Sequence, residues 1–387
     1  MQYILTRDQV HHHAAGLLQT YLGLRDFGAR CPARTLLAVV FAACCRLTSL
    51  ACAAARLLRA PSRETVRKAL LSNLPQVAEL ERCLNRALAA DLPAALRRRA
   101  QRLAVDLTLV PYHGLPYRDA AEVYRSLAKH GTSHFHAYAT AYVAYRGQRF
   151  TVALTWVRRG EALDEVLKRL LRRVAALGVR LRLLLLDRGF FSVGVIRYLQ
   201  AARYPFLMPV ALRGRQLDHP KGPSGTHVFL GWSRSGWGRY TLTASDRRTA
   251  TVAICVRLRN WAGQRGRHGR QRLVYAFWGL GPGSTAWVRQ TYRLRFGVET
   301  SYRQLHQGRA RTCSRDPAVR LFLVGVALLL RNVWVWLHYA VLSTPRRGGR
   351  RYHPERLSLK DLLLLLLHAA EAQLGTVDFI GSERPLE

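Results

Sequence analysis

Hydrophobic residues recur every three or four positions through residues 1–100, which is the spacing of amphipathic helices. Residues 35–55 are rich in Leu, Ala, Val and Cys at this spacing. A further segment starts at Ser62, a residue type that caps helix N-termini, and places Val66 and Leu70 on one face. The pattern therefore predicts an all-helical N-terminal segment.

The helix that begins at Ser62 has a basic face opposite its apolar one. That face carries three cationic residues: Arg63, Arg67 and Lys68. A short preceding helix and a break at Pro61 are typical of a helix-turn-helix, whose second helix enters a groove of DNA. The alternative is a solvated basic face on a helical bundle.

Beyond residue 102 the hydrophobic pattern changes to that of strands. Strand patterns cover three segments: 103–110, 134–145 and 149–157. A turn at Arg146–Gln148 joins the last two and predicts a hairpin. Helix and strand patterns then alternate over four segments: helix 163–176, buried strand 181–186, helix 192–202 and strand 205–210. This order predicts a mixed sheet with helices on its faces.

Residues 211–284 interrupt that order with a stretch rich in Gly, Arg and Trp. Strand-like runs within it predict a mostly β insertion: 240–243, 250–258 and 272–278. Helical patterns return over 287–306 and near 317–342, and Ser358 caps a final Leu-rich helix.

Composition and charge narrow the classes of partner. The 387 residues include 61 Lys and Arg against 23 Asp and Glu, a formal net charge of +38. This charge favours a polyanion partner, and the dominance of arginine, which forks onto phosphate oxygens, favours nucleic acid. The apolar stretch 321–342 contains Arg331, so we predict a buried helix and no membrane partner. Seven cysteines without a CxxC pair argue against a zinc ribbon or a disulfide framework and predict a cytoplasmic protein.

Three carboxylates are conspicuous in so basic a chain. Asp106 lies inside an apolar strand, Asp187 follows the buried strand 181–186, and Glu299 lies in the helical segment 287–306. Carboxylates from two neighbouring strands and a helix can hold two Mg²⁺ ions roughly 3.5–4 Å apart, an arrangement that serves phosphoryl transfer. The alternative is that each acid pairs with one of the many arginines.

The spacing around Glu299 resembles the Y-(2)-R-(3)-E-(6)-K signature of the insertion-sequence-four superfamily of DDE transposases. Tyr292, Arg295 and Glu299 stand at the signature offsets, and His306 stands where that superfamily has a lysine. At 3.6 residues per turn these four residues share one face of a helix. One stripe thus presents a phenol, a guanidinium, a carboxylate and an imidazole.

Further motifs resemble the same superfamily. Asp106–Thr108 is similar to its first aspartate motif and Asp187–Phe190 to its second. Residues 131–140 and 187–209 look like the branch first described in halophilic archaea. The resemblance covers about residues 100–345.

The resemblance implies a fold class and an organisation. The fold is α/β, with an RNase H-like mixed-sheet core interrupted by a mostly β insertion, an all-α N-terminal domain and a short helical C-terminal segment. The long gap between Asp187 and Glu299 independently requires an inserted subdomain. The expected boundaries are a helical DNA-binding domain at 1–100, the core at 101–210 and 285–345, the β-rich insertion at 211–284, and a basic linker with the C-terminal helix at 346–387.

The resemblance also implies residue roles. The catalytic triad that binds two Mg²⁺ ions, for which Mn²⁺ can substitute, is Asp106, Asp187 and Glu299. The contacts to DNA phosphates near the reacting strand end fall to Tyr292, Arg295 and His306, with Arg303 or Arg309 as alternatives to the partly charged His306. A flipped base stacks on an aromatic residue, for which four tryptophans of the insertion are candidates: Trp232, Trp237, Trp261 and Trp278.

Taken together, these features predict a DNA transposase that cleaves terminal inverted repeats and joins them to target DNA. The resemblance implies a cut-and-paste reaction through a hairpin intermediate, carried out by a homodimer on double-stranded DNA at the nucleoid of a prokaryotic cell. Two alternatives remain open: an RNase H-fold nuclease or resolvase without joining activity, and a non-catalytic DNA-binding protein derived from a transposase. A basic ribosomal or architectural protein would account for the charge but not for the buried acids.

Overall fold

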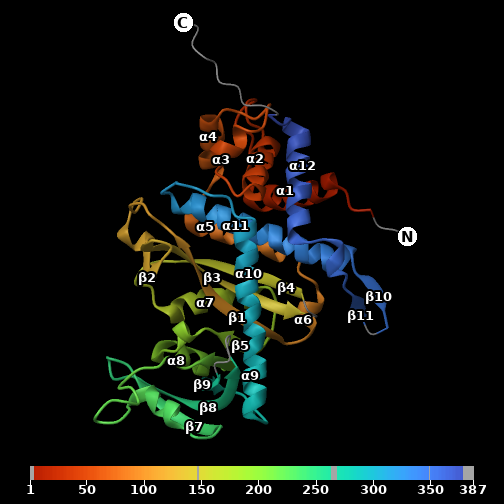
Figure 1. The fold of residues 1–387 in the computed structure, drawn as a ribbon. Coiled ribbons are helices and arrows are strands. Elements are labelled where there is room, and N and C mark those ends of the chain that lie inside the picture. Colours follow the sequence, from red (N-terminus) through yellow and green to blue (C-terminus); the bar gives the residue numbers. More distant parts are fainter. Residues whose placement is uncertain (1–3, 146–147, 263–267, 348, 378–387) are drawn as a thin grey trace.

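The computed structural model describes residues 4–145, 148–262, 268–347 and 349–377, without the side chains of residues 261, 262, 268, 298 and 299. One large sheet is flanked by helices (Figure 1). The helices are α1 (Arg7–Leu22), α2 (Ala33–Cys45), α3 (Leu50–Ala54), α4 (Arg63–Asn73), α5 (Val77–Ala89), α6 (Ala95–Arg98), α7 (Leu163–Ala176), α8 (Val193–Ala201), α9 (Thr285–Arg293), α10 (Gly297–Gln307), α11 (Pro317–Trp336) and α12 (Leu359–Leu374). The strands are β1 (Gln101–Pro111), β2 (Tyr124–Lys129), β3 (Thr132–Tyr145), β4 (Gln148–Val157), β5 (Leu181–Leu186), β6 (Phe206–Pro209), β7 (Gly236–Thr243), β8 (Thr249–Ala262), β9 (His268–Trp278), β10 (Thr344–Arg346) and β11 (Gly349–Arg351).

The N-terminal helices confirm the all-helical prediction, with one break. The helix predicted over 35–55 is divided into α2 and α3. Leu47 between them adopts a left-handed φ of 52°, and Ser49 starts the new helix by accepting a hydrogen bond from the Cys52 amide. α2 is buried along nearly its whole length and forms the centre of this helical layer.

α4 follows the prediction from its amphipathic pattern. Its N-cap is Ser62, whose side chain accepts a hydrogen bond from the Thr65 amide. Val66, Ala69 and Leu70 are at most 4% exposed and pack into the helical layer. The basic side of α4 therefore faces solvent.

In the described part of the chain, nine strands form one mixed sheet in the order β2-β3-β1-β5-β6-β9-β8-β7, with β4 also paired to β3. β5 runs parallel to both β1 and β6, and the other neighbours are antiparallel. Tyr145 pairs with Gln148, which confirms the predicted hairpin, although residues 146 and 147 of its turn lie outside the described residues. The short strand β2 is an addition that the hydrophobic pattern does not predict.

The β-rich insertion continues the central sheet. Its strands are β7, β8 and β9, close to the three predicted runs. β9 pairs with β6 from Phe206 opposite Trp278 to Pro209 opposite Tyr275. Figure 1 shows this extension in green, at the end of the molecule away from the N-terminal helices. The insertion therefore shares both faces of the sheet with the core.

Different helices pack against the two faces of the sheet, because side chains along each strand alternate between the faces. α7 and α8 cover one face. The apolar stripe of α7 is at most 1% exposed at Val166, Leu167, Leu170, Leu171 and Val174, and its first residue, Leu163, is partly buried. α9 and α10 cross the other face, and α11 packs between that face and the N-terminal helices. The face under α9 and α10 carries the candidate site.

α11 and the turn that follows it are buried, as the position of Arg331 predicted. The segment Pro317–Val341 is long and apolar enough to cross a membrane, but 94% of its most apolar window is buried inside the protein. Arg331 is 2% exposed and donates a hydrogen bond to Gln304 Oε1 at 3.0 Å. Burial, with a smaller contribution from Arg149, lowers the pKa of Arg331 to about 10.

The C-terminal segment returns to the N-terminal helices. α12 packs on α1 and α2, and its N-terminus has a capping box between Ser358 and Asp361. Arg46 donates to Glu371 at 2.7 Å across this contact. The predicted basic linker begins instead with a hairpin of β10 and β11, whose strands pair from Thr344 opposite Arg351. The two ends of the chain thus share one helical layer (Figure 1).

We expect Leu366→Ala to lower the free energy of unfolding, because Leu366 is fully buried where α12 meets the N-terminal helices. Truncation of a core leucine costs roughly 2–5 kcal/mol. Leu364→Ala is the matched control on the same helix, since Leu364 is 40% exposed, and a change below about 0.5 kcal/mol is expected. Urea denaturation followed by circular dichroism measures both. Equal losses in the two variants would contradict this packing of α12.

Candidate active site

The topology of the sheet places Asp106 beside Asp187. Asp106 lies in the middle of β1, and Asp187 is the first residue after β5. β1 and β5 are parallel neighbours, and Val105 pairs with Leu186. The two aspartates are therefore adjacent at the end of this parallel ladder, where open α/β sheets place their sites.

A guanidinium joins the two aspartates. The Nη2 atom of Arg295 lies 3.0 Å from Asp106 Oδ2 and 3.0 Å from Asp187 Oδ1. Because both contacts are made by the same nitrogen, Asp106 Oδ2 and Asp187 Oδ1 lie no farther apart than twice 3.0 Å, which is 6.0 Å. The side chain of Arg295 is 6% exposed, against 13% for Asp106 and 44% for Asp187. The site is a cation between two carboxylates, closed on the Asp106 side and open to solvent on the Asp187 side.

Buried tyrosines fasten the overlying helices to the sheet at this point. The Tyr302 hydroxyl donates to the Asp106 carbonyl oxygen at 2.9 Å and shares a 2.8 Å hydrogen bond with the Thr140 hydroxyl. The Tyr292 hydroxyl donates to the Leu186 carbonyl oxygen at 3.3 Å. Burial raises the pKa of both phenols, so they stay protonated and act as donors.

The helix predicted over 287–306 is interrupted where it crosses the sheet. α9 ends at Arg293, a 3₁₀ turn covers Leu294–Phe296, and α10 begins at Gly297, although Figure 1 shows the two helices as a nearly continuous column. The Tyr142 hydroxyl contacts the carbonyl oxygens of Leu294 and Arg295 at 3.2 and 3.0 Å. These contacts satisfy backbone acceptors of the tight turn. Burial raises the pKa of Tyr142 to about 12.

The structure brings together four of the residues in the predicted stripe and triad, and the side chain of a fifth, Glu299, is not described. Asp106, Asp187 and Arg295 meet directly, and Tyr292 lies against Arg295, whose guanidinium carbon is 5.9 Å from the phenol ring centre. Glu299 lies in α10, but its side chain is outside the described residues. Tyr142 and Tyr302 were not predicted as site residues. The alternation of Tyr142 with buried Tyr138 and Thr140 on β3, and the position of Tyr302 one turn after Glu299 in α10, were the available signals.

The two aspartates have the donor chemistry of a magnesium site. Oxygen ligands from carboxylates are those that Mg²⁺ prefers, and the pair already neutralises a cation at 3.0 Å. Among the side chains that the structure describes, no group of three or more His, Cys, Asp and Glu residues could hold a metal ion. The third predicted ligand, Glu299, lies outside that set of side chains.

The remaining predicted phosphate contacts lie farther along α10. Arg303 is exposed, and His306 lies in the last turn. Burial, followed by the neighbouring charges of Arg309 and His130, lowers the pKa of His306 below 6.5. The lowered pKa favours the neutral form of His306, which makes it a weaker phosphate contact than lysine.

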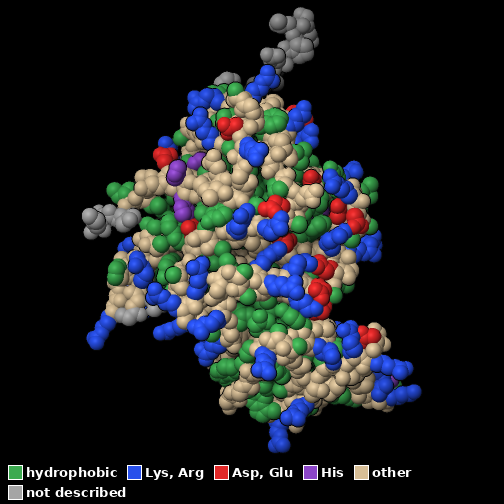
Figure 2. Space-filling model, turned by 180° about the vertical axis from the view of Figure 1, so that it is seen from behind, with side chains coloured by type: hydrophobic (Ala, Val, Ile, Leu, Met, Phe, Trp, Pro, Cys, Tyr) green, Lys and Arg blue, Asp and Glu red, His purple; other side chains and the backbone are tan. Residues whose placement is uncertain are grey.

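The predicted DNA-binding face of α4 is exposed. Arg63, Arg67 and Lys68 all point to solvent, and Arg67 donates to Glu64 at 2.7 and 2.9 Å. Figure 2 shows Lys and Arg side chains spread over one whole face of the molecule. The positive charge is therefore distributed from the helical layer to the insertion.

The described side chains of the predicted base-stacking tryptophans lie on different faces of the sheet. Trp237 is 45% exposed and packs edge-on against Phe277, which belongs to the cluster under α9. Trp232 and Trp278 pack with the cluster on the opposite face, under α7 and α8. Trp261 lies in β8, but its side chain is outside the described residues. Among the tryptophans whose side chains are described, Trp237 is thus the base-stacking candidate on the face that carries Asp106 and Asp187.

A solved structure shares this architecture. The cryo-EM structure of the piggyBac transposase synaptic complex with hairpin DNA is similar with a TM-score of 0.55 and 10% sequence identity, covering 96% of this chain and 81% of that chain. The likeness confirms the predicted fold class. Both chains share a large mixed sheet with helices at both ends.

The amino-acid sequence matches the model of a known protein family. Residues 97–332 match the family described as "Transposase DDE domain", so the chain belongs to that family. The matched range contains Asp106, Asp187 and Glu299. No curated protein sequence matches the chain. The protein is therefore a DNA transposase by family and fold.

We expect Arg295→Gln to destabilise the protein, because it leaves the adjacent carboxylates of Asp106 and Asp187 without this cation. Loss of one partner of a buried ion pair costs on the order of 3 kcal/mol. Adding Asp106→Asn to Arg295→Gln should recover part of this loss, since one of the two negative charges disappears. Thermal unfolding of the single and double variants tests this. A double variant no more stable than the single would rule out carboxylate repulsion as the cause.

Proposed function

We propose that this protein is a cut-and-paste DNA transposase of the insertion-sequence-four type, with motifs closest to the branch first described in halophilic archaea. The observation that supports this most directly is the meeting of Asp106 and Asp187 beneath the helix with the Tyr292, Arg295 and Glu299 spacing. In this proposal, the two aspartates and Glu299 form the catalytic triad.

The proposed triad binds two Mg²⁺ ions, for which Mn²⁺ can substitute. When bound, the ions activate the attacking oxygen and stabilise the leaving oxygen in phosphoryl transfer. Asp106, Asp187 and Glu299 would hold the ions, and Arg295, which contacts one oxygen of each aspartate, would compete with them for those oxygens. A guanidinium displaced from the aspartates would be suited to binding a DNA phosphate.

Phosphate contacts near the reacting strand end are assigned to Arg295 and Arg303, with Tyr292 as the donor that holds α9 on the sheet. We propose that Arg303 takes the role of the lysine in the signature. Arg303 presents an exposed guanidinium, whereas burial lowers the pKa of both His306 and Arg309.

The proposed reaction passes through a DNA hairpin, with a flipped base stacked on an aromatic residue. Flipping a base costs a few kcal/mol, and stacking on an aromatic ring offsets it. Trp237 is the candidate we favour, because its ring is exposed on the face of the sheet that carries Asp106.

The proposed partner is double-stranded DNA, both transposon ends and target, held by a homodimer in the cytoplasm at the nucleoid. The net charge of +38 supports a DNA partner. The exposed basic face of α4, in the helical DNA-binding region predicted for residues 1–100, supports a contact to DNA by Arg63, Arg67 and Lys68.

We expect Asp187→Ala to abolish Mg²⁺-dependent cleavage of the element's terminal inverted repeats, with a rate reduced more than about 100-fold, because one of the ligands is lost. Folding should be preserved, since the Asp187 side chain is 44% exposed. Asp218→Ala is the matched control, an exposed aspartate in the insertion. Gel assays of end-labelled repeats measure the cleavage.

Unchanged cleavage by Asp187→Ala would exclude the triad. Wild-type protein that cleaves ends but does not join them to target DNA would favour a nuclease or resolvase. Binding of DNA without metal-dependent cleavage of any end would favour a non-catalytic DNA-binding protein.

We expect the affinity for DNA to fall steeply with salt, by about 10³-fold or more between 50 and 200 mM if six or more phosphates are neutralised. Replacing Arg63 and Lys68 by Gln should reduce the slope of log K against log salt by about 1–2. Arg248→Gln is the control, since this exposed arginine is paired with Asp246. Fluorescence anisotropy measures the slopes. An equal slope in the α4 variant and wild type would remove α4 from the DNA interface.

A further inference from the structure

A pocket of about 450 Å³ lies beside the two aspartates, on the same face of the sheet. Ala104 and Leu185 form part of its floor, each two residues before Asp106 and Asp187 on the parallel strands β1 and β5. Two residues of a strand span roughly 7 Å. The 3₁₀ turn between α9 and α10 forms another wall of the pocket. The floor of the pocket therefore lies one strand repeat, about 7 Å, from the two aspartates.

The pocket is lined by three arginines: Arg102, Arg149 and Arg293. No Asp or Glu is among its described lining residues. Within the described part of the chain, none of these three guanidinium groups donates a hydrogen bond or forms an ion pair. A fourth arginine, Arg331, is buried close to Arg149, because the charge of Arg149 contributes to the lowered pKa of Arg331. Among the described side chains that line it, the pocket is therefore cationic and has no acidic partner.

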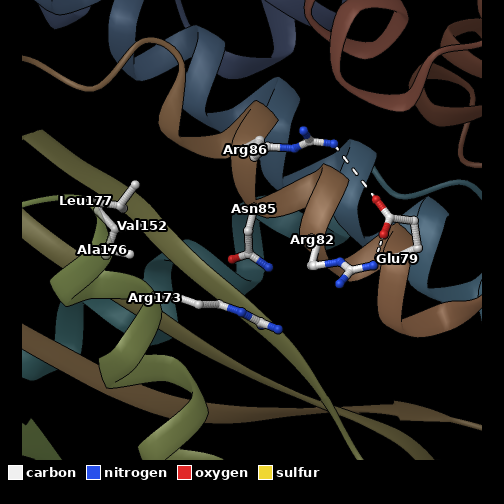
Figure 3. Close-up of a pocket in the computed structure, with 8 residues that line it drawn as sticks. All are labelled: Glu79, Arg82, Asn85, Arg86, Val152, Arg173, Ala176 and Leu177. Atoms are coloured by element: carbon white, nitrogen blue, oxygen red, sulfur yellow. Dashed lines mark hydrogen bonds and ion pairs between the residues drawn. The ribbon is translucent and has the colours of Figure 1, made fainter.

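A second pocket shows that arginines alone do not make such a site. The pocket of about 400 Å³ between α5, β4 and α7 is also lined by three arginines, and Figure 3 shows Arg82 and Arg86 directed at Glu79. The third, Arg173, pairs with Glu81. Two glutamates pair with the three arginines there, so most of the positive charge of that pocket is already neutralised.

The shape of the first pocket fits a phosphate ester. Arg149 reaches into it past Gly297, where a Cβ atom would lie only 2.4 Å from the Arg149 Nε. Phe296 stands at the rim and is 48% exposed, which allows a sugar or base to pack on its ring. Guanidinium groups bind phosphate oxygens through paired hydrogen bonds. An aromatic rim with a cationic interior is thus suited to a nucleotide unit.

We propose that this pocket binds a phosphate ester of a nucleotide, and that the ester belongs to the DNA strand next to the phosphate held at Asp106 and Asp187. The assignment to the strand rests on the proposed function. A free nucleotide has the same chemistry and is the other source. In either case Arg149 and Arg293 bind the phosphate and Phe296 packs against the nucleoside.

The test uses the full-length protein with Arg149→Gln and Arg293→Gln combined. Relative to wild type, the slope of log K against log salt for a terminal-repeat duplex should fall by about 1, with affinity at 100 mM salt reduced roughly tenfold. Arg82→Gln combined with Arg86→Gln removes the same charge from the compensated pocket and should leave the slope unchanged. Phe296→Ala, which keeps all charges, should weaken binding at an unchanged slope. Thermal unfolding establishes that each variant is folded.

A second arm uses thymidine monophosphate alone. Stabilisation of the wild type by millimolar nucleotide, absent in the Arg149 and Arg293 variant and combined with an unchanged DNA slope, would support the phosphate site with a free nucleotide as its source. An unchanged slope together with equal nucleotide effects in folded variants would overturn the inference. Cleavage by the wild type and its loss in Asp187→Ala are measured separately. The proposed function can therefore fail while the phosphate site stands, and the reverse.

Discussion

Two carboxylates that lie side by side on neighbouring strands repel each other, and the guanidinium of Arg295 holds them together. It contacts Asp106 and Asp187 at 3.0 Å each. Because Arg295 belongs to the turn between α9 and α10, this one contact also sets where the helix column crosses the sheet. The Tyr292 and Tyr302 hydroxyls then fasten the column to backbone carbonyls of β5 and β1. The arrangement of this face depends on that cation.

The same contact links the proposed chemistry to the conformation of the chain. In the proposed function, Arg295 and the metal ions would compete for the same carboxylate oxygens of Asp106 and Asp187. A single side chain, Arg295, thus neutralises the two carboxylates here and, in the proposed function, would also bind a DNA phosphate.

The distribution of partners, more than the number of arginines, distinguishes the basic surfaces. Arg82, Arg86 and Arg173 stand near acids of α5, so they serve the packing of α5 against β4 and α7. Arg102 and Arg149 line a pocket without a described acid. A net charge of +38 is therefore divided between compensated structural contacts and surfaces suited to an anion.

The sequence alone determined the elements with a strong apolar pattern, such as the stripe of α7 and the continuous apolar run of β5, because each has one stable way to be buried. It also identified Asp106 and Asp187 as candidate site residues, because a carboxylate within or directly after an apolar strand needs a cation as its partner. The tertiary structure decided what depends on distant neighbours. Those features are the break of the predicted helix at Leu294–Phe296, the pairing of β9 with β6, and the bridge by Arg295. Local pattern cannot specify them, because each is stabilised by contacts between segments far apart in the chain.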